Sequence, residues 1–114
     1  MSPITTHVLD LVLGLPAEGL AIVLEQGDAS GAWVELARGA TGADGRLTTL
    51  RPTNTALEAG VYRLRFATSA YFSKRGMSCF YPEVLLTFQI DDPAGHYHVP
   101  LLLSPYGYST YRGN

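Results

Sequence analysis

Hydrophobic and polar side chains alternate along several short stretches of this chain. In residues 60–68, GVYRLRFAT, a tyrosine, a leucine and a phenylalanine share one face, and a valine and two arginines share the other. This period of two is typical of a β-strand with one buried face. Similar runs predict seven further strands, at residues 4–13, 20–26, 33–40, 46–50, 84–90, 96–103 and 106–112.

Turn-forming residues separate these runs. Glycine permits positive φ, proline presets φ, and aspartate or asparagine bonds to its own turn. One short helix is predicted, with Ser69 at its N-cap and Gly76 after its last turn. Many short strands and one small helix favour an all-β antiparallel sandwich, built as a single domain over residues 1–114. The predicted turns lie at residues 14–19, 27–31, 41–45, 51–54, 91–95 and 104–107.

The strand at residues 96–103, HYHVPLLL, is apolar on both faces in its middle. His96 and His98 share one face with Pro100 and Leu102. A strand that is covered on both sides needs a second neighbour beyond the sandwich core. We therefore expect an oligomer in which this strand face forms an interface, with the histidines at its mouth.

Composition narrows the class of protein. Hydrophobic residues make up 46% of the 114 residues and charged residues 16%, which is unlike a disordered chain. The net charge of −2 argues against a nucleic-acid partner or a polybasic membrane anchor. The first residues do not resemble a signal peptide, and the chain does not end in a peroxisomal tripeptide. No apolar run approaches the roughly 20 residues of a spanning helix, so a cytoplasmic location is expected.

Several ionisable residues are candidates for chemistry. His96 and His98 could bind a metal or transfer protons, although a histidine pair without a third ligand is weak evidence for zinc. His7 shares an apolar strand face with Thr5, and Arg46 follows a turn. Taken one at a time, each of these residues is better explained as a structural or solvated side chain.

Together, however, five sequence blocks resemble the transthyretin-like family, and within it the enzymes that hydrolyse 5-hydroxyisourate in urate breakdown. The resemblance covers nearly the whole chain in order. It implies two four-stranded sheets with one short helix, and a homotetramer (a dimer of dimers) whose active sites lie in the channel between dimers. The blocks are THVLD at 6–10, GLPAEG at 14–19, DGR at 44–46, FYPEV at 80–84 and HYHVPLLLSPYGYSTYRG at 96–113.

The resemblance also implies which residues act. His7 and His98 would activate water and return a proton, and Arg46 would orient the substrate ring and stabilise the oxyanion. The six-membered lactam would open to give 2-oxo-4-hydroxy-4-carboxy-5-ureidoimidazoline, with no metal or cofactor required. Asn114 stands where the family usually ends in serine. Tyr111 and Arg112 would enter from a neighbouring subunit and close the pocket. The residues expected to bind substrate or line the channel are Tyr111, Arg112, Gly113, Ser109, Pro100 and Leu102.

Three alternatives remain open at this point. The channel could carry an aromatic ligand without catalysing a reaction, as a transthyretin-type binding protein. His96 and His98 could form part of a zinc hydrolase, which a chelator would inactivate. The chain could also be a purely structural interaction module. Accelerated decay of 5-hydroxyisourate that survives a chelator would exclude all three.

Overall fold

The computed structural model describes residues 3–50 and 57–114. The predicted turn at residues 51–54 lies outside these ranges. The described elements are β1 (Ile4–Asp10), β2 (Leu15–Pro16), β3 (Ala21–Gly27), β4 (Trp33–Ala40), β5 (Arg46–Leu47), β6 (Gly60–Phe66), α1 (Thr68–Ser73), β7 (Val84–Ile90), β8 (Tyr97–Ser104) and β9 (Gly107–Thr110).

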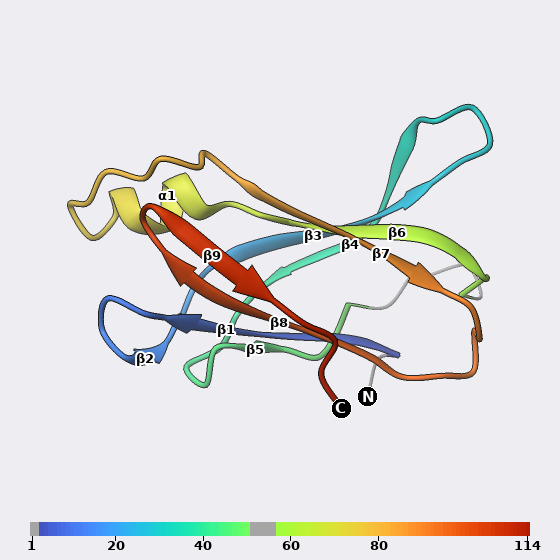
Figure 1. Cartoon of the computed structure of the whole chain (residues 1–114), viewed down its shortest axis with the longest axis horizontal. Coiled ribbons are helices and arrows are strands. Elements are labelled where there is room, and N and C mark those ends of the chain that lie inside the picture. Colours follow the sequence, from blue (N-terminus) through green and yellow to red (C-terminus); the bar gives the residue numbers. More distant parts are fainter. Residues whose placement is uncertain (1–2, 51–56) are drawn as a thin grey trace.

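Two sheets face each other, and α1 lies at one end of the molecule (Figure 1). The second sheet has the order β4-β3-β6-β7. The first sheet has the order β2-β1-β8-β9, and β5 also pairs with β1. The predicted β-sandwich with one short helix is therefore confirmed. The first sheet has five strands rather than four, because β2 forms within the stretch that was predicted as a turn.

The two ends of the chain meet in the first sheet. β1 and β8 run parallel, with a register from Ile4 opposite Tyr97 to Asp10 opposite Leu103. The other described strand pairs are antiparallel, so the prediction of an antiparallel sandwich is wrong for this pair. Figure 1 shows β1 and β8 side by side in this sheet.

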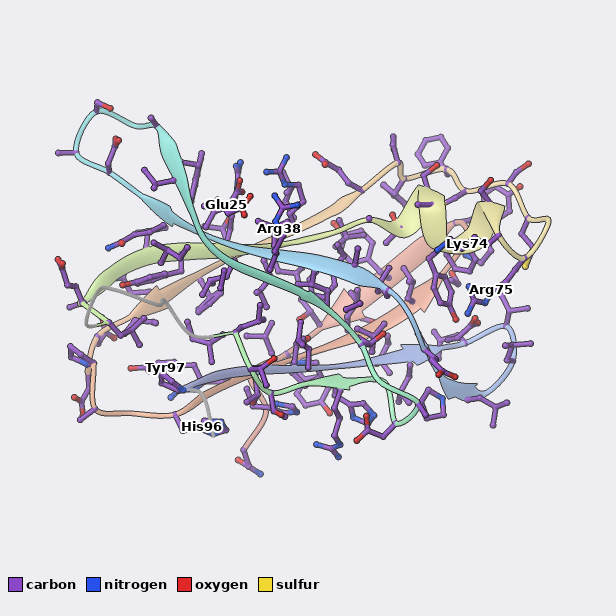
Figure 2. All side chains as sticks on the ribbon, turned by 180° about the vertical axis from the view of Figure 1, so that it is seen from behind. Glu25, Arg38, Lys74, Arg75, His96 and Tyr97 are labelled. Carbon is purple, nitrogen blue, oxygen red and sulfur yellow. The ribbon has the colours of Figure 1, made fainter. Side chains whose placement is uncertain are left out.

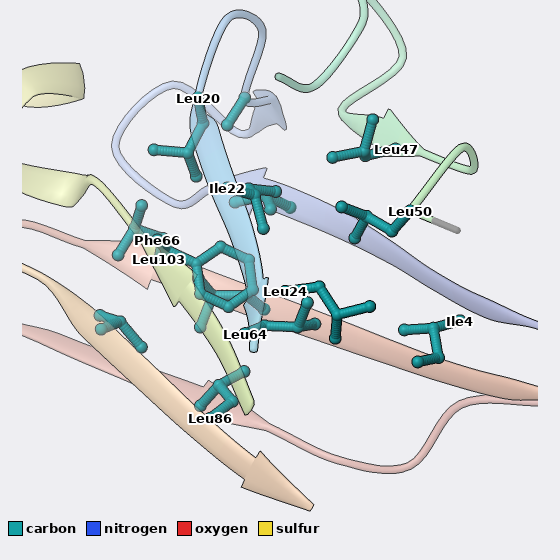
Figure 3. Close-up of a cluster of buried hydrophobic side chains, with 14 of the residues drawn as sticks. Ile4, Leu20, Ile22, Leu24, Leu47, Leu50, Leu64, Phe66, Leu86 and Leu103 are labelled. Atoms are coloured by element: carbon teal, nitrogen blue, oxygen red, sulfur yellow. The ribbon is translucent and has the colours of Figure 1, made fainter. Parts of the chain in front are cut away.

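Alternate side chains from both sheets fill the space between them. Ile22 and Leu24 of β3 meet Leu64 of β6 in the core that Figure 3 shows, and each is at most 1% exposed. Leu103 of β8 joins them from the first sheet. Fully burying one such side chain contributes about 1.5–3 kcal/mol to the free energy of unfolding. Burial of these alternate positions therefore holds the two sheets together.

Polar contacts cover the outer face of the second sheet. Buried Glu25 accepts hydrogen bonds from Arg63 Nε, at 2.6 Å, and from Arg65. The Arg63 guanidinium carbon lies 4.2 Å from the centre of the Trp33 ring. Figure 2 shows Glu25 and Arg38 on this sheet and His96 on the opposite side of the molecule. The outer face of the first sheet is therefore the one that carries the histidines.

The end of β1 and the start of α1 differ from the sequence predictions. The first strand was predicted to reach residue 13, but Asp10 Oδ1 accepts the Val12 and Leu13 N–H groups at 2.9 and 3.2 Å and turns the chain. Ser69 was predicted to cap α1, but it lies inside the helix. Gly76 follows the helix with φ of +70°, as predicted. Within the described residues, no helix is long and apolar enough to cross a membrane.

Candidate active site

The pairing of three strands determines which side chains gather on the outer face of the first sheet. His7 of β1 lies opposite Arg46 of β5 on one side and opposite Pro100 of β8 on the other. Thr5, two residues before His7, lies opposite His98. Directly paired residues point to the same face, with Cβ atoms about 4.5–5.5 Å apart. His7, Arg46 and His98 therefore lie on one face, although they are far apart along the chain.

A tight turn delivers Arg46 to this position. Gly45 has φ of +75°, and a Cβ on it would lie 2.5 Å from the Val8 carbonyl oxygen. The Val8 N–H donates to the Gly45 carbonyl at 2.8 Å, so the turn is held against β1. Asp44 Oδ1 accepts the Arg46 N–H at 3.0 Å. Only glycine combines this φ with so close an approach to β1, which explains the DGR sequence.

Thr5 links His98 of β8 to His96, which lies just before that strand. Its hydroxyl lies 2.8 Å from His98 Nδ1 and 3.1 Å from His96 Nε2. The two imidazole rings are nearly parallel, with an interplanar angle of 14° and centroids 6.5 Å apart. Since Nδ1 of His98 faces Thr5, Nε2 is the ring nitrogen left to meet a substrate.

The C-terminal segment closes over His98. The Gly113 N–H donates to the His98 carbonyl at 2.8 Å. A Cβ on Gly113 would lie 2.5 Å from His98 Cδ2 and 3.1 Å from Pro100 Cγ, so the glycine backbone rests directly on both rings. Thr110 Oγ1 donates to the Pro100 carbonyl at 2.7 Å and holds the segment in place.

The other residues expected at the site occupy different positions. Ser109 pairs with Leu102 farther along the same face, and Ser109 is exposed. Tyr111 is 60% exposed. The Arg112 guanidinium carbon lies 4.8 Å from the centre of the ring of Tyr97, which is buried.

The environment of His98 favours its neutral form. Partial burial lowers the pKa of His98 below its ordinary value of 6.5, and the nearby positive charge of Arg46 lowers it further, as do His7 and His96. A neutral imidazole beside a guanidinium can accept a proton from water while the cation stabilises developing negative charge. The arrangement is therefore suited to hydrolysis of a polar, planar substrate.

Two further observations bear on alternative ligands. In residues 3–50 and 57–114, no group of three or more histidine, cysteine, aspartate or glutamate side chains is arranged to hold a metal ion. A pocket of about 580 Å³ opens between β7 and the β8–β9 hairpin, and His98 lines it together with Phe88, Tyr97, Val99 and Arg112 among others.

Thr5 was not among the site residues expected from the sequence, and His96 was considered only as a possible metal ligand or proton carrier beside His98. The period of two placed Thr5 on the same strand face as His7, and it placed His96 on the face of His98. What it could not reveal was the parallel register that puts Thr5 opposite His98. The contact between the threonine hydroxyl and both rings follows from that register.

Comparison with known proteins points to one family. Residues 4–113 match the HIUase/Transthyretin family. A 5-hydroxyisourate hydrolase from Salmonella dublin is 46% identical over 111 residues, which cover 97% of this chain and 80% of that protein. One from Mus musculus is 46% identical over 114 residues, which cover 99% and 96%. The crystal structure of sea bream transthyretin in complex with thyroxine has a TM-score of 0.89 and 37% identity, and covers 97% of this chain and 94% of that one.

Proposed function

We propose that this chain, which belongs to the HIUase/Transthyretin family, hydrolyses 5-hydroxyisourate in the breakdown of urate. Relatives that bear this activity in their names are 40–46% identical over nearly the whole chain. The observation that carries the proposal is the position of His7, Arg46 and His98 on one face of the first sheet. Three separate strands supply these residues, and each has a role in the chemistry.

The reaction opens the six-membered lactam. Neutral His98 takes a proton from water, and the resulting hydroxide adds to the lactam carbonyl carbon. Arg46 stabilises the oxyanion, since its planar guanidinium matches paired acceptors. The C–N bond then breaks, and the departing nitrogen receives a proton from the histidine pair of His7 and His98. The product is 2-oxo-4-hydroxy-4-carboxy-5-ureidoimidazoline.

Freshly prepared 5-hydroxyisourate provides the direct test, because its spontaneous decay is visible in the ultraviolet spectrum. Purified protein should accelerate that decay at catalytic concentration, and the acceleration should survive a chelator. Saturable binding of an aromatic ligand such as thyroxine, without faster decay, would instead make this chain a carrier like the sea bream relative.

The site also requires assembly. We infer a homotetramer, a dimer of dimers, in which the outer face of the first sheet lines the channel between dimers, in a cytoplasmic protein. Arg46 is exposed in a single chain, and a cation stabilises an oxyanion best where water is excluded. Leu11, Leu13 and Leu15 are each more than half exposed beside β1, which supports a contact with another copy.

The pH profile follows from the environment of His98. We expect the acid limb of kcat/KM to have its midpoint below 6.5. As the pH falls, protonation removes the base, and a lowered pKa moves that loss to lower pH. The groups that disfavour the proton are Arg46 on β5, His7 on β1 and His96 next to β8. A midpoint at or above 6.5, measured by initial rates and by NMR titration of His98, would contradict this environment.

Gly113 should be sensitive to the smallest added side chain. Gly113→Ala places a methyl group 2.5 Å from His98 Cδ2, so the ring must turn or the C-terminal segment must lift. Misplacing a catalytic group by about 1 Å can cost on the order of 10²-fold, and we expect a loss of that order in kcat.

Gly107→Ala is the matched control, because a Cβ there meets nothing nearer than Ser104 Oγ at 3.9 Å. It lies in the same hairpin and should retain its turnover. Equal kcat values for the two variants would show that close packing of Gly113 on His98 is unimportant.

A further inference from the structure

The Thr5 hydroxyl has one proton and two histidine neighbours. It lies 2.8 Å from His98 Nδ1 and 3.1 Å from His96 Nε2, and its residue is only 2% exposed. A hydroxyl can donate one hydrogen bond and accept others. If Thr5 donates to one ring, it can keep both contacts only by accepting an N–H from the other. The tautomers of the two histidines are therefore linked through Thr5.

Two arrangements satisfy both contacts when the rings are neutral and the Thr5 hydroxyl donates to one of them. In the first, His98 Nδ1–H donates to Thr5 and Thr5 donates to His96 Nε2, which leaves His98 Nε2 unprotonated. In the second, His96 Nε2–H donates to Thr5 and Thr5 donates to His98 Nδ1, which leaves the proton of His98 on Nε2. Only the first arrangement allows His98 to accept a proton from water through Nε2.

Protonation of His98 distinguishes the two arrangements further. An imidazolium carries a proton on both nitrogens, so its Nδ1–H must donate to Thr5. The first arrangement already has this hydrogen bond and does not change during the reaction. The second would require the Thr5 hydroxyl to turn and both hydrogen bonds to be rebuilt. A site that is organised before the reaction avoids this rearrangement.

We propose that Thr5 and His96 are positioning residues that hold His98 in its Nδ1–H tautomer, through the chain of hydrogen bonds from His98 to Thr5 to His96. The inference rests on the proposed function, because it assigns the proton-accepting nitrogen of that reaction. The parallel register of β1 and β8 places Thr5 opposite His98, and Gly113 packs on the same ring. The ring is thus fixed both by a hydrogen bond and by packing.

The test reads the tautomer directly. Two-bond ¹⁵N–¹H NMR correlations of the histidine side chains, recorded on the full chain above pH 7, should show His98 protonated at Nδ1. Thr5→Val removes the hydroxyl at nearly constant volume and should shift His98 toward the Nε2–H form. Loss of the orienting partner of a metal-binding histidine typically costs about 10–100-fold, and we expect a fall of this size in kcat here, with KM unchanged. Thr5→Ser should restore both the tautomer and most of the kcat.

Two further variants keep the result interpretable. Thr6→Val is the matched control, because Thr6 is equally buried and donates to the Val99 carbonyl at 2.6 Å, on the other face of β1. It should leave the tautomer of His98 unchanged. His96→Phe alters an exposed residue and keeps a ring in place, but it removes the acceptor for the Thr5 hydroxyl. The hydroxyl is then free to donate to His98 Nδ1, and the Nε2–H form should increase.

The proposal is overturned if His98 is protonated at Nε2 in the unaltered chain, or if it keeps the Nδ1–H form in both Thr5→Val and His96→Phe. It is also overturned if Thr5→Val lowers kcat no more than Thr6→Val does. Failure of the proposed function gives a different result. In that case the unaltered chain does not accelerate the decay of 5-hydroxyisourate, whereas the NMR spectra still report the tautomer.

Discussion

Replacing His98 with alanine is expected to lower kcat by about 10²–10⁴-fold, the contribution of a positioned general base. His98 is the side chain on which Thr5, Gly113 and the electrostatic effect of Arg46 converge. Its removal leaves the core intact, because the ring lies on the outer face of the first sheet. The measurements are steady-state kinetics, the melting temperature and the oligomeric state of the same preparation.

His98→Asn separates proton transfer from hydrogen bonding. An amide can still reach Thr5, but it cannot take a proton from water. We expect kcat to fall about as far as in His98→Ala, within the same 10²–10⁴-fold range. Turnover near that of the unaltered protein, in either variant, would remove His98 from the mechanism.

Replacing Arg46 with either alanine or lysine should lower kcat. Removing one oxyanion donor typically costs about 10²–10³-fold in kcat, and we expect Arg46→Ala to fall in this range. Arg46→Lys should be nearly as damaging, because an ammonium group cannot form the paired contacts of a planar guanidinium. Comparing kcat and KM for the two variants distinguishes geometry from charge.

Arg38→Lys provides the matched control for this experiment. Arg38 pairs with Glu35 on the outer face of the second sheet, where its Nη2 lies 2.5 Å from Oε1. The same substitution there should leave kcat unchanged. Full activity of Arg46→Lys would show that only the charge at position 46 matters. The proposed paired contacts of the Arg46 guanidinium would then be wrong.

The alternation of hydrophobic and polar residues correctly predicted strands whose bounds depend on the nearby sequence alone. β4 and β7 have the predicted bounds, 33–40 and 84–90. The alternation was misleading where a side chain formed hydrogen bonds with the backbone and ended a strand. The apolar run continues past Asp10, but the Asp10 carboxylate captures two backbone N–H groups and ends β1. A periodicity of two cannot detect such a capture.

The partner of each strand was harder to predict than the strand itself. Pairing of β1 with β8 joins residues that are more than 90 positions apart in the chain. Nothing in the alternation of either strand states that the two run parallel or which residues face each other. The register depends on how the whole sandwich closes, and this also determines that Thr5 lies opposite His98.

The candidate site was expected from family resemblance rather than from local pattern. Taken singly, His7, Arg46 and His98 had ordinary structural explanations, and the structure now places them on one face. Their catalytic roles stay predictions until the variants are measured. Arg112 was expected to enter the site from a neighbouring subunit, and within its own chain its side chain packs on Tyr97, so its role at the site stays a prediction. The direction of a side chain in a terminal segment depends on its neighbours more than on its motif.

A crystal structure of the assembled protein with a stable purine analogue tests the central claim most directly. The account predicts the analogue on the outer face of the first sheet, with Arg46 contacting its carbonyl groups and His98 Nε2 within hydrogen-bond reach. A second copy of the chain should cover it. An analogue bound elsewhere on the protein, with the side chains of His7, Arg46 and His98 facing open solvent, would contradict this assignment.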